Sequence, residues 1–192
     1  MDIFKTWFMV GFDHILNVQA LDHILFVLAL VVIYKPNMIK QIVILITAFT
    51  IGHSITLILS ALDIINYNQK VIEFAIPLTI VITSLNNILN RKKIITKAMG
   101  TNYIIALVFG LIHGLGFANY LKALLFQDNI ILELFSFNVG IEAAQLIVVF
   151  IFSIISFVGS NYIFKKRENW VFFVSSAIFG VSLMLTLNAK FW

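Results

Sequence analysis

Six long apolar runs constrain the fold of this chain more than any other feature of its sequence. A helix that crosses the hydrocarbon core of a bilayer needs about 20 apolar residues, and each run is long enough. Backbone groups in lipid must be paired within the chain, and the alternating pattern of a transmembrane barrel is missing. We therefore expect an all-α polytopic membrane protein, a bundle of about six transmembrane helices. The runs lie near residues 17–34, 41–61, 71–89, 101–125, 133–163 and 170–189.

Composition agrees with this interpretation and excludes a soluble globular enzyme. Of the 192 residues, 61% are hydrophobic and 11% are charged, whereas roughly a quarter of a soluble domain is charged. Six spans would use about 120 residues and leave only short connections, so we expect residues 1–192 to form one transmembrane domain. Residues 1–5 lack a basic segment followed by a cleavable apolar stretch, so we expect no leader to be removed.

The basic residues predict the orientation of the chain in the membrane. The net charge is +4, but the basic residues lie in short loops between apolar runs, so we interpret them as topology signals and expect no nucleic-acid partner. Nine of the 13 fall in alternate loops, which the positive-inside rule places in the cytoplasm, with both termini outside. These nine are Lys35, Lys40, Arg91, Lys92, Lys93, Lys97, Lys165, Lys166 and Arg167.

The absence of cysteine limits the chemistry available to the chain. Disulfides, thiolate metal sites and cysteine nucleophiles are excluded. Imidazole and carboxylate ligands suit Zn, Ni, Co or Fe(II), whereas Cu(I) favours sulfur ligands. With five scattered methionines and no cysteine, a copper site is not expected.

Histidines and acidic residues within the apolar runs are the main functional signal. In lipid such side chains cost several kcal/mol unless they are paired, hydrated or bound to a metal ion. Counting about 1.5 Å per helical residue from the cytoplasmic basic residues places three histidines and Glu73 at depths between about 18 and 27 Å, one layer in the outer half. Glu142 comes out at about 35 Å and joins this layer only if its helix is long and tilted. The candidate metal ligands are Asp22, His23, His53, Glu73, His113 and Glu142.

Further polar residues share helical faces with these candidates. Asn138, Glu142 and Gln145 follow one another at i, i+4 and i+7, so they form one polar face that we expect to point inward. Asp22 would either bind the metal or orient a histidine. Structural roles stay open for Glu73, as an interfacial carboxylate at a helix start, and for Glu142 and Gln145, as hydrogen-bonding groups between helices. The second run has a similar face with Thr50, His53 and Ser54. The further candidates for the site are His14, Asn138, Gln145 and Gln19.

The fourth run contains closely spaced small residues and a short pattern that also occurs in the second run. Gly110 and Gly114 have the small-xxx-small spacing that lets another helix approach closely. The second and fourth runs are expected to be parallel, and each carries a Phe four residues before a His, at His53 and His113.

Four segments in this order carry a resemblance to a known family: Asp22-His23, Phe49–Ser54, Phe109–Ala118 and Phe137–Glu142. Over nearly its whole length the chain resembles the HupE/UreJ family of membrane proteins. The resemblance implies a six-helix protein of the bacterial inner membrane that takes up nickel or cobalt as a secondary permease without ATP, in families tied to hydrogenase and urease maturation.

The resemblance also implies roles for particular residues. The family's first metal-binding motif, HPxxGxDH, maps onto His14 and the Asp22-His23 pair, and a later HG motif maps onto His113-Gly114. In this chain Ile15 stands in place of the proline, and the gap from His14 to Asp22 is two residues longer than in the motif.

Three functions are consistent with these residues. The leading hypothesis is a permease for divalent nickel, cobalt or zinc, or a membrane protein that handles such an ion, with the six candidate ligands as an outward-facing site. Assembly as a homo-oligomer stays open. The second is an intramembrane metalloenzyme that cleaves a lipid or peptide, with Glu73 or Glu142 as general base. It is favoured by the expectation that the inner half of the bundle lacks an ionisable residue. The third is a membrane protein that binds b-type haem between His53 and His113.

Overall fold

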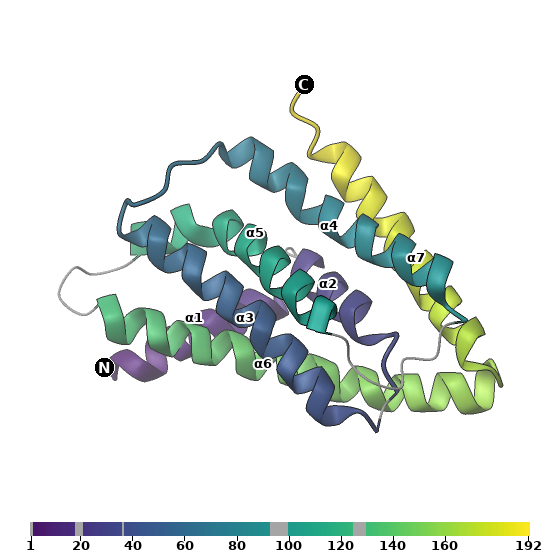
Figure 1. Cartoon of the computed structure of the whole chain (residues 1–192). Coiled ribbons are helices and arrows are strands. Elements are labelled where there is room, and N and C mark those ends of the chain that lie inside the picture. The colour runs from purple at the N-terminus through teal and green to yellow at the C-terminus, as the bar shows by residue number, and fades with distance from the viewer. Residues whose placement is uncertain (1, 18–20, 36, 93–99, 125–129) are drawn as a thin grey trace.

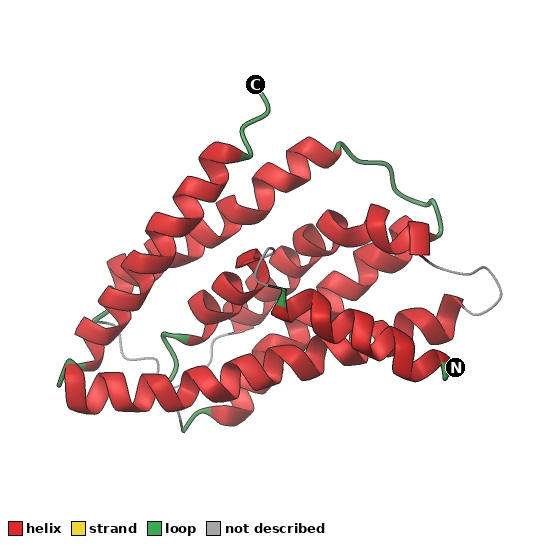
Figure 2. Ribbon diagram, turned by 180° about the vertical axis from the view of Figure 1, so that it is seen from behind, coloured by secondary structure: helices red, strands yellow, loops and turns green. Residues whose placement is uncertain are grey.

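The computed structural model describes residues 2–17, 21–35, 37–92, 100–124 and 130–192, and all the regular structure in these ranges is helical (Figures 1 and 2). The elements are α1 (Ile3–Leu16), α2 (Leu21–Val31), α3 (Ile39–Ala61), α4 (Gln69–Asn90), α5 (Gly100–Leu124), α6 (Ile130–Val158), the π-helical turn η1 (Gly159–Ile163) and α7 (Arg167–Asn188).

Five of these helical segments are long and apolar enough to cross a membrane. They are α3, α4, α5, α6 together with η1, and α7. The helices α1 and α2 form a sixth span if they are counted as one segment, which bends by 72° between them. The expected all-α polytopic fold is confirmed, with five or six candidate spans.

The first predicted span differs from the structure, whereas the other five agree to within a few residues. A single helix over 17–34 was expected, but α2 covers only Leu21–Val31, and α1 comes before it. The side chain of Asp2 starts α1 by accepting a hydrogen bond from the backbone N–H of Phe4 at 3.1 Å. Residues 3–12 are mostly apolar, but they were too few to be recognised as a span by length alone.

The helices α3 to α7 run back and forth between two ends of the bundle (Figure 1). The end of α4, the start of α3 and the connection from α6 to α7 lie toward the right in Figure 1. We call this the basic end, because Lys35, Lys40, Arg91, Lys92 and residues 165–167 belong to it. The sides of the membrane that the two ends face, and so the location of the termini, stay a prediction from the charge pattern.

Glycine brings α3 and α5 into backbone contact. A Cβ atom on Gly52 would fall on the backbone carbonyl of Leu107, and one on Gly110 would fall on the carbonyl of Phe49. Only glycine permits such an approach, which confirms the prediction that Gly110 lies against another helix. The two helices are parallel, since contacts advance along both in the same direction.

A second glycine contact joins α1 to α6. A Cβ on Gly11 would meet the carbonyl of Phe137, and one on Gly140 would meet the carbonyl of Phe8. Each helix has a glycine where the backbone of the other helix comes closest, so the two backbones are in direct contact at both positions. This contact holds the last turns of α1, which contain His14, against the bundle.

Candidate metal centre

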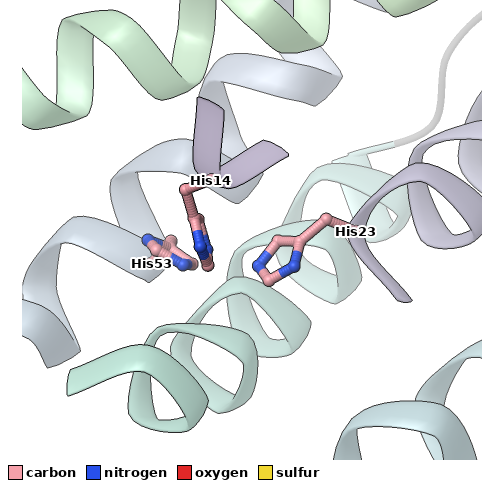
Figure 3. Close-up of side chains that lie close together, drawn as sticks. All are labelled: His14, His23 and His53. Atoms are coloured by element: carbon pink, nitrogen blue, oxygen red, sulfur yellow. The ribbon is translucent and has the colours of Figure 1, made fainter. Parts of the chain in front are cut away.

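Three imidazoles from three helices meet inside the bundle. His14 comes from the end of α1, His23 from the start of α2 and His53 from the middle of α3, and their rings point toward one another (Figure 3). One ring nitrogen of each lies within 4.8 Å of those of the other two. Two imidazoles on one transition-metal ion have nitrogens at most about 4.2 Å apart, twice the metal–nitrogen bond length. Small side-chain rotations would therefore bring all three onto one ion.

The nitrogens of these rings are buried without hydrogen-bond partners among the described residues. This holds for Nε2 of His14, Nε2 of His23 and both ring nitrogens of His53. Buried polar atoms are nearly always hydrogen-bonded, so each exception needs a cause such as an absent ion. His53 is 0% exposed, which leaves neither of its nitrogens open to bulk solvent. The donor atoms therefore fit a metal ion that all three rings bind.

The Asp22 carboxylate orients the ring of His23. Its Oδ1 atom accepts a hydrogen bond from Nδ1–H of His23 at 3.1 Å and another from the backbone N–H of the same residue at 2.9 Å. With the proton on Nδ1, the lone pair on Nε2 is directed into the cluster. This is the usual arrangement of a metal-bound histidine and its supporting carboxylate. Of the two roles open to Asp22, the geometry favours the orienting one.

Replacing Asp22 with asparagine should weaken metal binding by about 10- to 100-fold, the usual cost of losing a carboxylate behind a metal-bound histidine. The amide oxygen still accepts the hydrogen bond from His23, but the negative charge behind the metal-bound ring is gone. Equilibrium titration of purified protein with nickel measures the change. Asp13→Asn is the matched control, because Asp13 is exposed on α1. Equal affinities for the two variants would contradict the role of Asp22.

His113 on α5 is a fourth imidazole beside this group. Its ring centre lies 5.4 Å from that of His23, and the residue is 0% exposed. The hydroxyl of Thr79 donates to the Ile76 carbonyl at 2.7 Å, so its oxygen accepts from Nε2–H of His113 at 3.0 Å. The Nδ1 atom of His113 is then a free acceptor, and it is buried with no partner in the described part of the chain.

Thr79→Val should lower nickel affinity by about tenfold if His113 binds the ion, since it removes the acceptor that holds the tautomer of the ring. Valine has nearly the same shape as threonine, so packing on α4 is retained. Thr79→Ser keeps the hydroxyl and should bind nickel as the unmodified protein does. The same titration with nickel tests both variants. An unchanged affinity in Thr79→Val would remove His113 from the ligand set.

Aromatic rings and glycines surround the imidazoles. The ring of Phe117 lies 3.8 Å from that of His14, and the ring of Phe26 lies 4.7 Å from that of His113. On the α5 side, a Cβ on Gly114 would meet the backbone carbonyl of His53. An apolar shell of this kind limits water access and strengthens the electrostatic interactions of bound ions.

Glu73 lies outside this group. It is exposed near the start of α4, and its Oε1 atom accepts a hydrogen bond from the side chain of Gln69 at 3.2 Å. Gln69 also donates to the backbone carbonyl of Gly116, at 3.2 Å. The structural interpretation of Glu73, as a carboxylate at the start of a span, therefore agrees with its position. The prediction that it shares one site with the histidines is not supported by this geometry.

The two predicted polar faces of α3 and α6 meet each other. Ser54 lies against Asn138 with an oxygen–oxygen distance of 2.6 Å, and Thr50 lies against Gln145 with one of 2.9 Å. Hydrogen bonds of this kind join helices within membranes. Asn138 and Gln145, expected as further members of the metal site, are thus partners of hydroxyl groups on α3. Gln19, the last such residue, lies outside the described residues.

Glu142 corrects an expectation about the inner half of the bundle. Its Oε1 atom accepts a hydrogen bond from the hydroxyl of Thr47 at 2.6 Å. Thr47 lies six residues before His53 and seven after Lys40, about 9 Å from the one and about 10 Å from the other along α3. Glu142 therefore lies between the histidines and the basic end, where no ionisable residue was expected. The count from Lys165 placed it too far out, because Ile130–Ile163 is a 34-residue segment whose basic end extends beyond the start of α3 (Figure 1).

His14 is the residue whose importance the sequence alone understated. From the sequence it is only a further candidate, because its predicted position is close to the membrane–water interface, where a polar side chain needs no functional explanation. The bend between α1 and α2 and the contact of α1 with α6 bring it to the level of His23 and His53. The signal that pointed to it was the motif shared with the resembling family.

Comparison with known proteins gave one match. A family model described as HupE / UreJ protein matches residues 1–190 of the chain. Searches of curated proteins and of solved structures returned no significant match.

Proposed function

The chain belongs to the HupE/UreJ family, a nickel/cobalt transporter-like family, and from this premise we propose that it is a secondary permease for nickel or cobalt ions. The observation that carries the proposal is the meeting of His14, His23 and His53, whose buried nitrogens lack partners among the described residues. Asp22 orients His23, and His113 supplies a fourth nitrogen. The ion is the cargo of the protein.

The donor set agrees with this choice of ion. Imidazole nitrogen binds nickel and cobalt well, and the chain offers no thiolate that would favour softer ions. Nothing in the family match or in the ligand types favours zinc over these two. Four imidazoles with one supporting carboxylate give a site with little negative charge, so a divalent ion keeps most of its charge there and is not held by strong ion pairing.

Release of the ion requires the ligands to separate. The imidazoles lie on α1, α2, α3 and α5, and two of these helices, α3 and α5, touch through their backbones at Gly52 and Gly110. A sliding motion along such a contact is a known way to alternate between two arrangements of a bundle.

The metalloenzyme alternative is less well supported. A general base must lie within hydrogen-bond reach of the water that it activates, directly or through one further water. Glu73 is exposed beside Gln69, and Glu142 lies beside Thr47 about 9 Å along α3 from His53. Among the described residues, neither carboxylate belongs to the group of ligand atoms that lie within 4.8 Å of one another, and the family is transporter-like rather than enzymatic.

The haem alternative conflicts with the packing of α3 and α5. These helices touch through their backbones at Gly52, Gly110 and Gly114, on either side of His53 and His113. A porphyrin ring between the two histidines would have to separate the helices. A visible absorption spectrum of the purified protein tests this directly, and we expect no haem bands.

Uptake into liposomes tests the proposed function. Purified protein is reconstituted into vesicles that contain a metal-sensitive dye, and nickel or cobalt is added outside. We expect dye quenching in vesicles with protein and none in empty vesicles. Tight binding of nickel without any uptake would contradict the permease and favour a metal-handling or catalytic role.

A further inference from the structure

We propose that Glu142, with Thr47 and the buried amide of Gln145, forms a second cation site, a relay through which the ion moves from the histidines toward the basic end. The inference rests on the proposed permease function. It adds a site made of oxygen ligands to the nitrogen site already described. The juxtaposition that carries it is the row of polar pairs between α3 and α6.

This row begins at the level of the histidines. Ser54, next to His53 in α3, pairs with Asn138. Along α3, Thr50 lies one turn further toward the basic end and pairs with Gln145, and Thr47 lies one more turn on and pairs with Glu142. Along α6 the order is Asn138, Glu142, Gln145, so the last two pairs cross. Steps of three to four residues along a helix are about 5 Å apart. A cation that leaves the histidines would therefore find oxygen atoms at each step.

The amide of Gln145 has capacity for a ligand. Gln145 is 0% exposed, and only one of the two polar atoms of its amide has a partner among the described residues. The hydroxyl of Thr50 has a single proton and lies 3.1 Å from the Ile46 carbonyl and 2.9 Å from the amide. In the described part of the structure, Oε1 of Gln145 faces this hydroxyl and Nε2 is the atom without a partner. A half-turn of the amide would exchange the two atoms: Nε2 would donate to Thr50, the Thr50 proton would go to Ile46, and Oε1 would be free to bind a cation.

Glu142 supplies the charge that such a site needs. It is half-buried in α6, and it is the carboxylate that the described structure places between the level of His53 and the basic end. An ionisable side chain inside a span is costly without a partner, and its neighbour there is the neutral hydroxyl of Thr47. Oxygen ligands hold nickel and cobalt less tightly than imidazole does. A weaker second site suits an ion that must move on.

The competing explanation is that these pairs only join α3 to α6. Variants of Glu142 distinguish this explanation from the relay. Glu142→Gln keeps an oxygen that accepts from Thr47 but loses the charge. Glu142→Asp keeps the charge but is too short to reach Thr47. For a relay site, aspartate should retain more nickel uptake than glutamine, and glutamine should lose at least about tenfold. For a purely structural pair, the order would be reversed, and that result would overturn the proposal.

Nickel binding by the same variants shows whether the first site and the fold are intact. We expect the affinity of the histidine site to change by less than about twofold in both variants, because Thr47, the partner of Glu142, lies about 9 Å from His53 along α3. Thr47→Val removes one oxygen of the proposed site and keeps the carboxylate, so it should lose less uptake than Glu142→Gln does. Equal losses of uptake in Thr47→Val and Glu142→Gln would also overturn the relay.

The failure of this inference is distinguishable from the failure of the proposed function. If the unmodified protein takes up nickel and Glu142→Gln takes it up equally fast, the permease stands and the relay is wrong. If the unmodified protein takes up neither nickel nor cobalt, the permease is wrong. A second, weaker nickel-binding step that is lost in Glu142→Gln would then still support the second site.

Discussion

Replacement of His53 with alanine is expected to abolish tight nickel binding while the protein remains folded. Both ring nitrogens of His53 are buried without partners among the described residues, so no hydrogen bond is broken by the change. Losing a supporting group lowers metal affinity by about 10- to 100-fold. Losing a direct ligand should lower it more, so we expect nickel affinity to fall by at least about 100-fold. Titration of the purified protein with nickel measures it.

Thermal unfolding provides a second measurement of the same variant. A ligand at about 100 times its dissociation constant stabilises a folded protein by about 2.7 kcal/mol. Nickel should therefore raise the melting temperature of the unmodified protein and leave that of His53→Ala unchanged. Ser54→Ala is the control, because Ser54 is adjacent in α3 and bonds to Asn138 instead. The metal site would be refuted if His53→Ala kept the full response to nickel.

The three histidines His14, His23 and His53 should act as a unit. His14→Ala and His23→Ala are expected to lose binding to a similar degree as His53→Ala, because three nitrogens within 4.8 Å share one ion. Combining two of these changes should add little to either alone, since residues of one network are not additive.

Gly110→Ala should destabilise the protein strongly, although the change adds only one methyl group. The new Cβ would fall on the backbone carbonyl of Phe49, and backbone cannot move aside as the tip of a side chain can. Overpacking of this kind costs about 1 to 3 kcal/mol. Because His53 and His113 lie on the two helices that are forced apart, nickel affinity should fall together with stability.

Gly180→Ala is the matched control for this experiment. Gly180 also lies within a helix, α7, but nothing lies within 4 Å of the Cβ that the change adds. Alanine is favoured over glycine within helices by roughly 0.5–1 kcal/mol, so this variant should be as stable as the unmodified protein or slightly more so. Thermal unfolding in detergent compares the two variants. Equal melting temperatures would show that the α3–α5 contact does not require glycine at position 110.

Much of the fold could be predicted from the sequence, because the bilayer sets strict requirements on single helices. Thickness and the need to pair backbone groups decide how long and how apolar a span must be. The runs at 41–61 and 71–89 therefore correspond closely to α3 and α4. The same requirement failed at the first run, where α1 and α2 share one span across a bend and neither is long enough alone.

The sequence by itself also determined which polar residues needed a partner in the membrane, since the cost of burying an imidazole or carboxylate in lipid depends on the residue alone. Only the tertiary structure decided which partner each one has. It placed His14 beside His23 and His53, and it made Thr47 the hydrogen-bond partner of Glu142. Counting along a helix measures depth, but the neighbours of a side chain depend also on the rotation, tilt and bend of each helix. Those are set by contacts between helices, here by the glycines that let the backbones touch.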